Sequence, residues 1–274
     1  MRNLLSIGFV PPAPGSPQAR ELAARVRQHG QHYPAGEAGA YFCWKDRTGA
    51  QLWAVYDAYD QLKGLYPLYE GTTRFRVRLE HLHPGRHPLL GSCKVWAAPP
   101  AVQGEGGQPG LFAFEFDTPA FQLLQHVPVG QVHEAHICAF AQSIRLYDTP
   151  EDLWAAQPAG AIRVPVPAFF PAGLFVTGGA YAHRTRAMVA FTGTVVCAAL
   201  IENSLTGDPY LQMEAETEGG RLALLCDTQL LPAVPRAGQV FAGNFWLGGS
   251  FPARGYRSPE APRKTFWKRI GLAR

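Results

Sequence analysis

The chain has 274 residues, of which 47% are hydrophobic and 17% charged, and its formal net charge is +4. This hydrophobic content excludes a wholly disordered chain, and the length suits two or three small domains. The small net charge excludes a surface that is basic throughout, because residues 254–274 carry a net charge of +6 and the rest of the chain a net charge of −2. The 29 Gly and 24 Pro residues predict short strands and many turns, so we expect a mainly β (α+β) fold.

Residues 1–70 predict an N-terminal β-α-β-β unit. An apolar run at Leu4–Val10 predicts its first strand. Ser16 followed by Pro17 is typical of the start of a helix, and Gly30 should end that helix.

Two apolar runs, 41–44 and 51–56, flank the turn-forming residues 46–49 and predict a hairpin, with a further strand at 64–69. This order also resembles half of a glyoxalase-type module, a family that binds its metal through His and Glu on the strands. The strand 52–56 carries no such ligand, so we expect no metal site there.

Residues 71–148 and 191–251 predict two copies of one unit. Their register breaks once, at the loop-like segment 99–110. The order of alternating strands resembles the five-stranded, partly open barrel of OB-folds, so we expect two tandem OB-like barrels, each with its own core. The matched pairs are Gly71 with Gly193, Glu80 with Glu202, Gly85 with Gly207, Leu89 with Leu211, Ala113 with Ala223, Asp117 with Asp227, and Gly130 with Gly238.

The residues outside the two copies predict a connector at 149–190 and a basic tail at 252–274. The connector should begin with a short helix at Thr149–Leu153. Inside the second copy, the strand Val195–Ile201 is apolar at every position, which predicts burial on both faces. The residues Gly248–Ser250 predict a turn.

Several of these features together resemble an uncharacterised family of bacterial proteins. They are the hairpin, the repeated G-T, D-T and G-Q-V framework, the connector sequence FFPAGLF and the stretch ENSLTGDPYLQMEAETEGG. The resemblance covers most of residues 1–250, and it implies a fold without implying an activity.

Five cysteines lie in apolar, strand-like runs and form no CxxC pair. We therefore expect reduced, buried thiols in a cytoplasmic protein. The first ten residues lack a long apolar core and a cleavage site, so we expect no secretory signal. No apolar stretch is long enough to predict a membrane span.

The most distinct candidate site is an arginine ridge formed by Arg74, Arg76 and Arg78. Alternate strand residues point the same way, so three guanidiniums could face successive phosphates of a nucleic acid. Lys94 and Trp96 could add a cation and a stacking platform for single-stranded bases. Two alternatives remain: an ordinary solvated strand face, or contacts between these arginines and outward glutamates of the second copy at 214 and 216.

The tail mixes cations with large apolar residues, a composition that suits an anionic membrane surface or a partner protein. An ordinary tail packed on its own protein is the alternative. The residues concerned are Arg263, Lys264, Phe266, Trp267, Lys268 and Arg269.

The sequence contains no nucleophile elbow, P-loop or dinucleotide fingerprint. His81 and His83 share a strand face, but no third ligand completes a metal site. We therefore expect no catalytic residue, metal or cofactor, and favour a non-catalytic binding protein whose ligand is first a protein partner and second a nucleic acid. The alternative is an enzyme with a pocket between the N-terminal unit and the first barrel.

Overall fold

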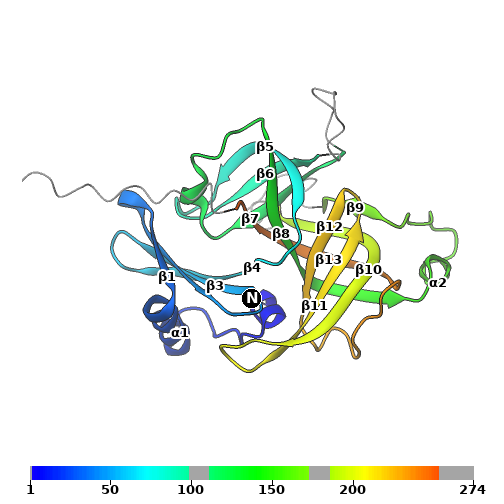
Figure 1. Ribbon diagram of the computed structural model, residues 1–274, viewed down its shortest axis with the longest axis horizontal. Coiled ribbons are helices and arrows are strands. Elements are labelled where there is room, and N and C mark those ends of the chain that lie inside the picture. Colours follow the sequence, from blue (N-terminus) through cyan, green and yellow to red (C-terminus); the bar gives the residue numbers. More distant parts are fainter. Residues whose placement is uncertain (1, 99–110, 173–185, 253–274) are drawn as a thin grey trace, which may run out of the picture.

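The computed structural model describes residues 2–98, 111–172 and 186–252 (Figure 1). Strands dominate these residues, which confirms the prediction of a mainly β protein. None of the helices within them is long and apolar enough to cross a membrane. The predicted loop 99–110 and the tail residues proposed for membrane or partner binding lie outside the described residues.

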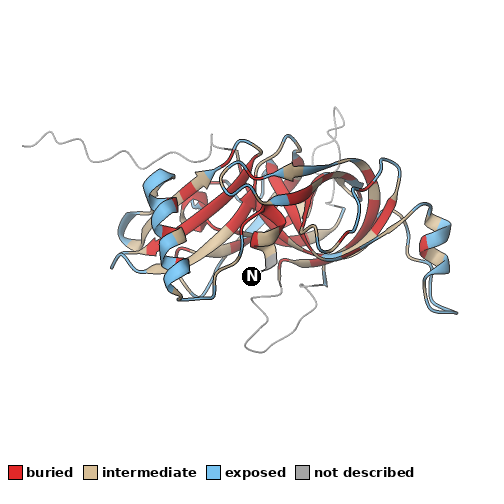
Figure 2. Ribbon diagram, turned by 90° about the horizontal axis from the view of Figure 1, so that it is seen from below, coloured by how far each residue is buried: buried red, intermediate tan, exposed pale blue. Residues whose placement is uncertain are grey.

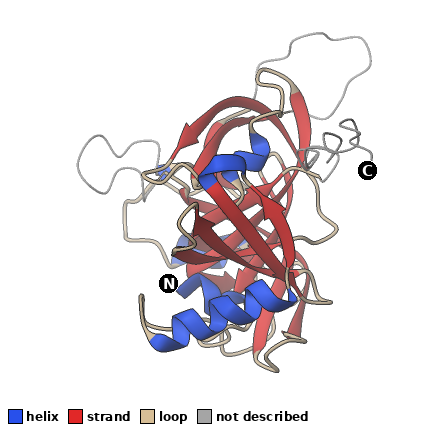
Figure 3. Cartoon of the chain, turned by 90° about the vertical axis from the view of Figure 1, so that its left-hand side faces the viewer, coloured by secondary structure: helices blue, strands red, loops and turns tan. Residues whose placement is uncertain are grey.

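The N-terminal sheet contains β1 (Gln31–Pro34), β2 (Gly39–Lys45), β3 (Ala50–Asp57) and β4 (Leu62–Tyr69), paired antiparallel in chain order. Helix α1 (Pro17–His29) packs on β2, β3 and β4 and runs beside the sheet in Figure 3. Its outer side is exposed (Figure 2). As predicted, Ser16 caps the helix, its hydroxyl accepting a hydrogen bond from the Ala19 N–H at 3.1 Å.

The predicted first strand at Leu4–Val10 is wrong, because this segment forms the 3₁₀ helix η1 (Arg2–Ile7). A short apolar run has the same composition in a buried strand and in a buried helix, so periodicity could not separate them. Leu4, Ile7 and Phe9 are buried against the N-terminal sheet in either case. The apolar composition agrees with the burial of these three residues, but the predicted conformation of the segment is wrong.

The remaining strands are β5 (Phe75–Pro84), β6 (Gly91–Ala97), β7 (Ala113–Thr118), β8 (Val132–Tyr147), β9 (Ala168–Phe170), β10 (Met188–Glu202), β11 (Pro209–Thr217), β12 (Gly220–Cys226) and β13 (Val240–Ser250). Short helices η2 (Gly36–Ala38), η3 (Phe121–Leu124) and α2 (Pro150–Ala155) lie between strands. The predicted helix after Thr149 is present as α2, with a capping box formed by Thr149 and Asp152.

Two closed rings of strand pairings share the central strands β8 and β13. The first barrel is the ring β5-β6-β7-β13-β8, and the second is the ring β10-β11-β12-β8-β13. In the first ring, the first copy supplies the meander β5-β6-β7 and its fourth strand β8, and the second copy supplies β13. In the second ring, the second copy supplies the meander β10-β11-β12 and its fourth strand β13, and the first copy supplies β8. Each barrel is therefore completed by a strand from the other copy.

The ladders of the two copies match strand for strand. The first strand of each copy contacts the turn that precedes the fourth strand, through Leu79 in β5 and Val195 in β10. The next residue of each first strand forms a β-bulge. Both positions exchange the same backbone hydrogen bonds with that turn: Leu79 with Gly130 and Gln131, and Val195 with the corresponding Gly-Gln pair at 238–239. The sequence match of these two turns is therefore also a structural match.

The sequence alignment of the first strands was wrong by six residues. The structure places Leu79 on Val195, so that Glu80 falls on Val196 and not on Glu202. The predicted pairs of the third strands, Ala113 with Ala223 and Asp117 with Asp227, are wrong by two residues, since Asp117 falls on Leu225. The reason is that the hairpins differ in length, which an alignment with a single gap could not accommodate.

The hydrophobic core is shared by the two barrels, contrary to the expectation of one core for each copy. One cluster of buried residues joins Phe75 and Phe114 of the first copy to Phe191 and Phe241 of the second. Because β8 and β13 belong to both rings, their inward residues pack with both meanders. Figure 2 shows the buried residues concentrated on the strands in the middle of the molecule, while exposed residues lie at its edges.

Two local predictions in the second copy are also wrong. The apolar segment Val195–Ile201 is not buried on both faces, since Cys197, Ala199 and Leu200 are exposed. Its composition resembles that of a central strand, but past Thr194 it pairs with β11 alone within the described residues. Residues 248–250 form the end of β13 instead of a turn.

Hairpin ends from both barrels hold the N-terminal unit in place. The Asn203 side-chain amide donates to the Ile7 carbonyl at 2.6 Å, and the Thr206 hydroxyl donates to the Gly8 carbonyl at 2.6 Å. From the other side, the Tyr41 hydroxyl donates to the Leu89 carbonyl at 2.6 Å. These bonds, with a second buried cluster that reaches β8 and β12, fix the N-terminal sheet against the shared strands.

Candidate functional site

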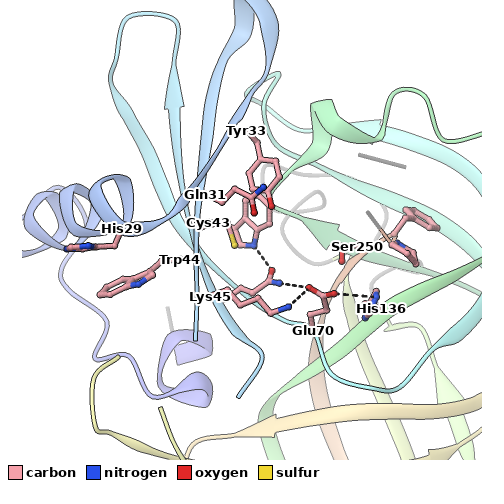
Figure 4. Close-up of a pocket in the computed structure, with 13 residues that line it drawn as sticks. His29, Gln31, Tyr33, Cys43, Trp44, Lys45, Glu70, His136 and Ser250 are labelled. Atoms are coloured by element: carbon pink, nitrogen blue, oxygen red, sulfur yellow. Dashed lines mark hydrogen bonds and ion pairs between the residues drawn. The ribbon is translucent and has the colours of Figure 1, made fainter. Parts of the chain in front are cut away.

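A cavity of about 440 Å³ lies between the N-terminal sheet and the shared strands β8 and β13 (Figure 4). The sheet contributes residues from β1, β2 and β3 and from the end of β4, and the barrels contribute His136 of β8 and Ser250 at the end of β13. The polar side chains of its lining include Gln31, Tyr33, Lys45, Gln51, Glu70, His136 and Ser250.

Strand alternation explains which side chains of β2 face the barrels. Cys43 and Lys45 lie on the barrel side of the sheet, whereas Trp44 lies on the opposite side beside His29 (Figure 4). Successive residues of a strand point to opposite faces, so the period-two pattern fixes this division. The polar part of the cavity is therefore the part that faces the barrels.

Glu70 is the centre of a hydrogen-bond network in the cavity. Its Oε2 accepts a hydrogen bond from Lys45 Nζ at 2.9 Å and another from Gln51 Nε2 at 2.9 Å. The indole N–H of Trp53 donates to Gln51 Oε1 at 2.9 Å, which fixes the orientation of the amide. The other carboxylate oxygen, Oε1, lies 3.8 Å from His136 Nε2, too far for a hydrogen bond. This oxygen is available to a donor.

His136 is buried, with 4% of its surface exposed, and its Nδ1 has no hydrogen-bond partner among the described residues. Burial and the nearby Arg74 charge lower the pKa of His136, although the Glu70 carboxylate and an interaction with the Gly71 backbone oppose them. The imidazole is therefore neutral at neutral pH and has one donor and one acceptor nitrogen. Nδ1 is closed to solvent, so a ligand in the cavity would meet this imidazole at Nε2, the nitrogen that faces Glu70.

The charges in the cavity nearly cancel. Burial alone would raise the pKa of Glu70, but the hydrogen bond and charge of Lys45 lower it, so the carboxylate stays ionised beside the ammonium. Burial raises the pKa of Cys43 to about 12, so the thiol stays protonated. Arg74 does not line the cavity, and it donates to the Gly71 carbonyl at 2.9 Å. The cavity thus presents hydrogen-bonding groups with little net charge.

The arrangement favours binding over nucleophilic chemistry. Ser250 lies opposite His136 in the β8–β13 ladder, but its hydroxyl is not hydrogen-bonded to this imidazole in the described structure. Nucleophilic catalysis needs a hydroxyl or thiol activated by an adjacent base or by a lowered pKa, and neither Ser250 nor Cys43 meets this condition.

The predicted arginine ridge lies on and just before β5. Arg76 lies opposite Glu134 of β8 and Arg78 opposite Val132, while Arg74 precedes the strand and donates to the backbone. The alternative in which these arginines meet the second copy's glutamates is wrong, because Glu214 and Glu216 both pair with Arg221 of their own barrel. Nucleic-acid binding by the ridge stays a prediction.

Lys94 and Trp96 lie side by side on β6, and both interact with Glu80. Lys94 Nζ lies 3.1 Å from Glu80 Oε2, and the Trp96 indole N–H donates to the same oxygen at 3.1 Å. The structure therefore brings these two predicted residues together, with an acid between their polar ends. An acid at this point weakens the case for a phosphate contact, and the stacking role stays a prediction.

The rings of His81 and His83 lie 4.4 Å apart, which agrees with the predicted shared face. Within the described residues, no group of three His, Cys, Asp or Glu side chains is arranged to hold a metal ion.

Sequence reasoning missed the residues of the cavity. None of Lys45, Glu70 and His136 is among the residues that the sequence predicts for a site. One signal was present: His136 is a titratable residue between Ala135 and Ile137, inside an apolar strand. The pairing of Glu70 with Lys45 had no signal, because 25 positions separate them.

No family model, curated protein or solved structure matches this chain. The geometry of the cavity is therefore the basis for inferring a function.

Proposed function

We propose that this chain is a non-catalytic binding protein that holds a small molecule in the cavity between the N-terminal sheet and the shared strands. The observation that carries the proposal is the 3.8 Å gap between Glu70 Oε1 and His136 Nε2 at the wall of the cavity. Two polar groups that face each other without a direct hydrogen bond leave room for a bridging polar group, which a ligand could supply.

The size and support of the cavity agree with this role. A volume of about 440 Å³ lies within the roughly 300–1,000 Å³ common for ligand pockets. Most of its polar residues lie on strands whose positions are set by ladders on both sides, and sites on such elements are held more rigidly than sites on loops. The proposal includes an OB-like assignment for the barrels and a cytoplasmic location, which suits five free thiols.

Crystals soaked with a library of small fragments, neutral and charged, test the proposal. We expect fragment density in the cavity beside His136 and Glu70. The variant Gln31→Trp places an indole at the exposed rim and should remove this density. The control Gln18→Trp, on the exposed side of α1, should leave it unchanged. Fragments that bind only elsewhere, or equally in both variants, would refute a small-molecule cavity.

A further inference from the structure

We infer that the ligand of this cavity is a neutral ring compound with several hydroxyl groups, which is the chemistry of a monosaccharide or short oligosaccharide. The inference rests on the proposed function, because it names the ligand class of the same cavity. Three properties of the lining lead to it: cancelled charge, open groups of both hydrogen-bonding kinds, and an aromatic wall.

The cancelled charge disfavours an ionic ligand. Lys45 and Glu70 form an ion pair at 2.9 Å, His136 is neutral, and Arg74, whose charge also acts on Glu70 and His136, does not line the cavity. A bound anion would have to compete with Glu70 for Lys45, and a bound cation would have to compete with Lys45 for Glu70. Because the two side chains are 47% and 37% exposed, solvent screens the unpaired charge, and the expected loss is a several-fold change in affinity. A neutral ligand leaves the pair intact.

The open hydrogen-bonding groups match hydroxyls. Glu70 Oε1 can only accept, while Nε2 of the neutral His136 donates or accepts according to its tautomer. The hydroxyls of Tyr33 and Ser250 line the same space and can do both. A ligand hydroxyl also donates and accepts, so one such group could bridge Glu70 and His136 across their 3.8 Å separation. Several hydroxyls on one ring would serve the whole set.

The aromatic side chains of the lining favour a ligand that contains a ring. Tyr33 stacks on Trp53 with ring centroids 5.4 Å apart and an interplanar angle of 29°. The hydrogen bond from Trp53 to Gln51 fixes this indole, and Phe251 lines the cavity from the barrel side. Flat, apolar side chains beside polar groups suit a ligand with C–H faces and a polar rim, and saturated sugar rings have this form.

Three matched series of sugars test the inference: glucose, galactose and mannose, each with its uronate and its 2-amino analogue. Isothermal titration calorimetry at pH 7.5 should show that at least one neutral sugar binds. We expect its uronate and amino sugar to bind at least fivefold more weakly. The ring and most hydroxyls are shared within a series, so the difference reports charge.

Charge variants make the test specific to the cavity. Glu70→Gln leaves Lys45 without its acid and should shift the preference at least fivefold toward the uronate. Lys45→Met leaves Glu70 unpaired and should shift it toward the amino sugar. The pair Lys94→Met and Glu80→Gln removes an ion pair of similar exposure on β5 and β6, outside this cavity, and should change nothing.

The outcomes separate the two proposals. If the unchanged protein prefers a uronate or an amino sugar, or binds no neutral sugar while fragments occupy the cavity, the ligand class is wrong and the cavity stands. Unaltered preference in both charge variants would also overturn the class. If fragments themselves avoid the cavity, the proposed function fails and this inference fails with it.

Discussion

The two barrels share one ladder, but their equivalent outward positions carry opposite chemistry. Matching the ladders places Glu115 and Asp117 of β7 on Ala223 and Leu225 of β12. The apolar pair on β12 lies under the N-terminal unit, in the second buried cluster. The acids on β7 meet polar partners: Ser92 donates to Glu115 at 2.9 Å, and the Trp246 indole donates to Asp117 at 2.6 Å.

The same contrast appears at the ends of the first strands past the bulge. In β5 this end carries His81 and His83, whereas in β10 it carries Cys197 and Leu200, whose exposed fraction is 56%. A repeated backbone therefore does not impose a repeated surface. The segment that packs against a strand face decides which residues that face carries. Changes in the shared strands, on β7 and on β10 therefore test how far the two barrels differ.

The largest effect should follow from a change in the shared strands. Leu247 of β13 is fully buried, lies opposite Ala139 of β8 and belongs to the core common to both barrels. We expect Leu247→Ala to lower the free energy of unfolding by about 2–5 kcal/mol, since it leaves a cavity. Native-state hydrogen exchange should show amides of β6 and β12 losing protection together.

The control for this prediction is Leu200→Ala on the exposed part of β10, which should change stability by no more than about 0.5 kcal/mol. If exchange accelerates in one barrel alone, the barrels are separable units and the shared core described above is not cooperative.

A smaller effect, dependent on pH, should follow from the acid on β7. Burial, reinforced by the Glu115 charge and opposed by the Trp246 hydrogen bond, raises the pKa of Asp117 to about 7. The folded state therefore keeps a proton that the unfolded state releases near pH 4, so this group destabilises the fold as pH rises from 4 to 7. Asp117→Asn should remove this loss, on the order of 2 kcal/mol between pH 4.5 and 7.5 in urea unfolding.

Asp148→Asn provides a control of opposite sign. The Gln239 hydrogen bond and the Arg236 charge lower the pKa of Asp148, so its contribution is present at neutral pH and disappears on acidification. Parallel pH curves for the unchanged protein and Asp117→Asn would show that Asp117 titrates normally.

The smallest effect on stability should come from a change at Cys197, whose thiol should also differ most in reactivity from the other cysteines. Cys197 is exposed on β10, whereas the other four cysteines are buried. A disulfide reagent such as DTNB should label one thiol of the native protein rapidly and the others only on unfolding. Cys197→Ser should abolish the rapid phase and leave the melting temperature nearly unchanged. A rapid phase of two or more thiols would contradict the burial of the remaining cysteines.

The ridge and the cavity show which parts of a site can be predicted from a sequence. Arg74, Arg76 and Arg78 stood out because their spacing is local, and the structure does place the last two on one strand. The residues of the cavity come together only through the packing of the N-terminal sheet on β8. Glu70 and His136 lie in different layers, and no local spacing relates them.

By itself, the sequence determined the mainly β class, the helix from Ser16 to Gly30, the hairpin at 46–49 and the matched turns at Gly130 and Gly238, because capping, turn chemistry and period-two alternation act within a few residues. Only the tertiary structure decided that the two barrels share their fourth strands, which residues of β7 and β12 are covered, and that Lys45, Glu70 and His136 line one cavity. These outcomes depend on contacts between segments far apart in the chain, and composition and periodicity carry no information about such contacts.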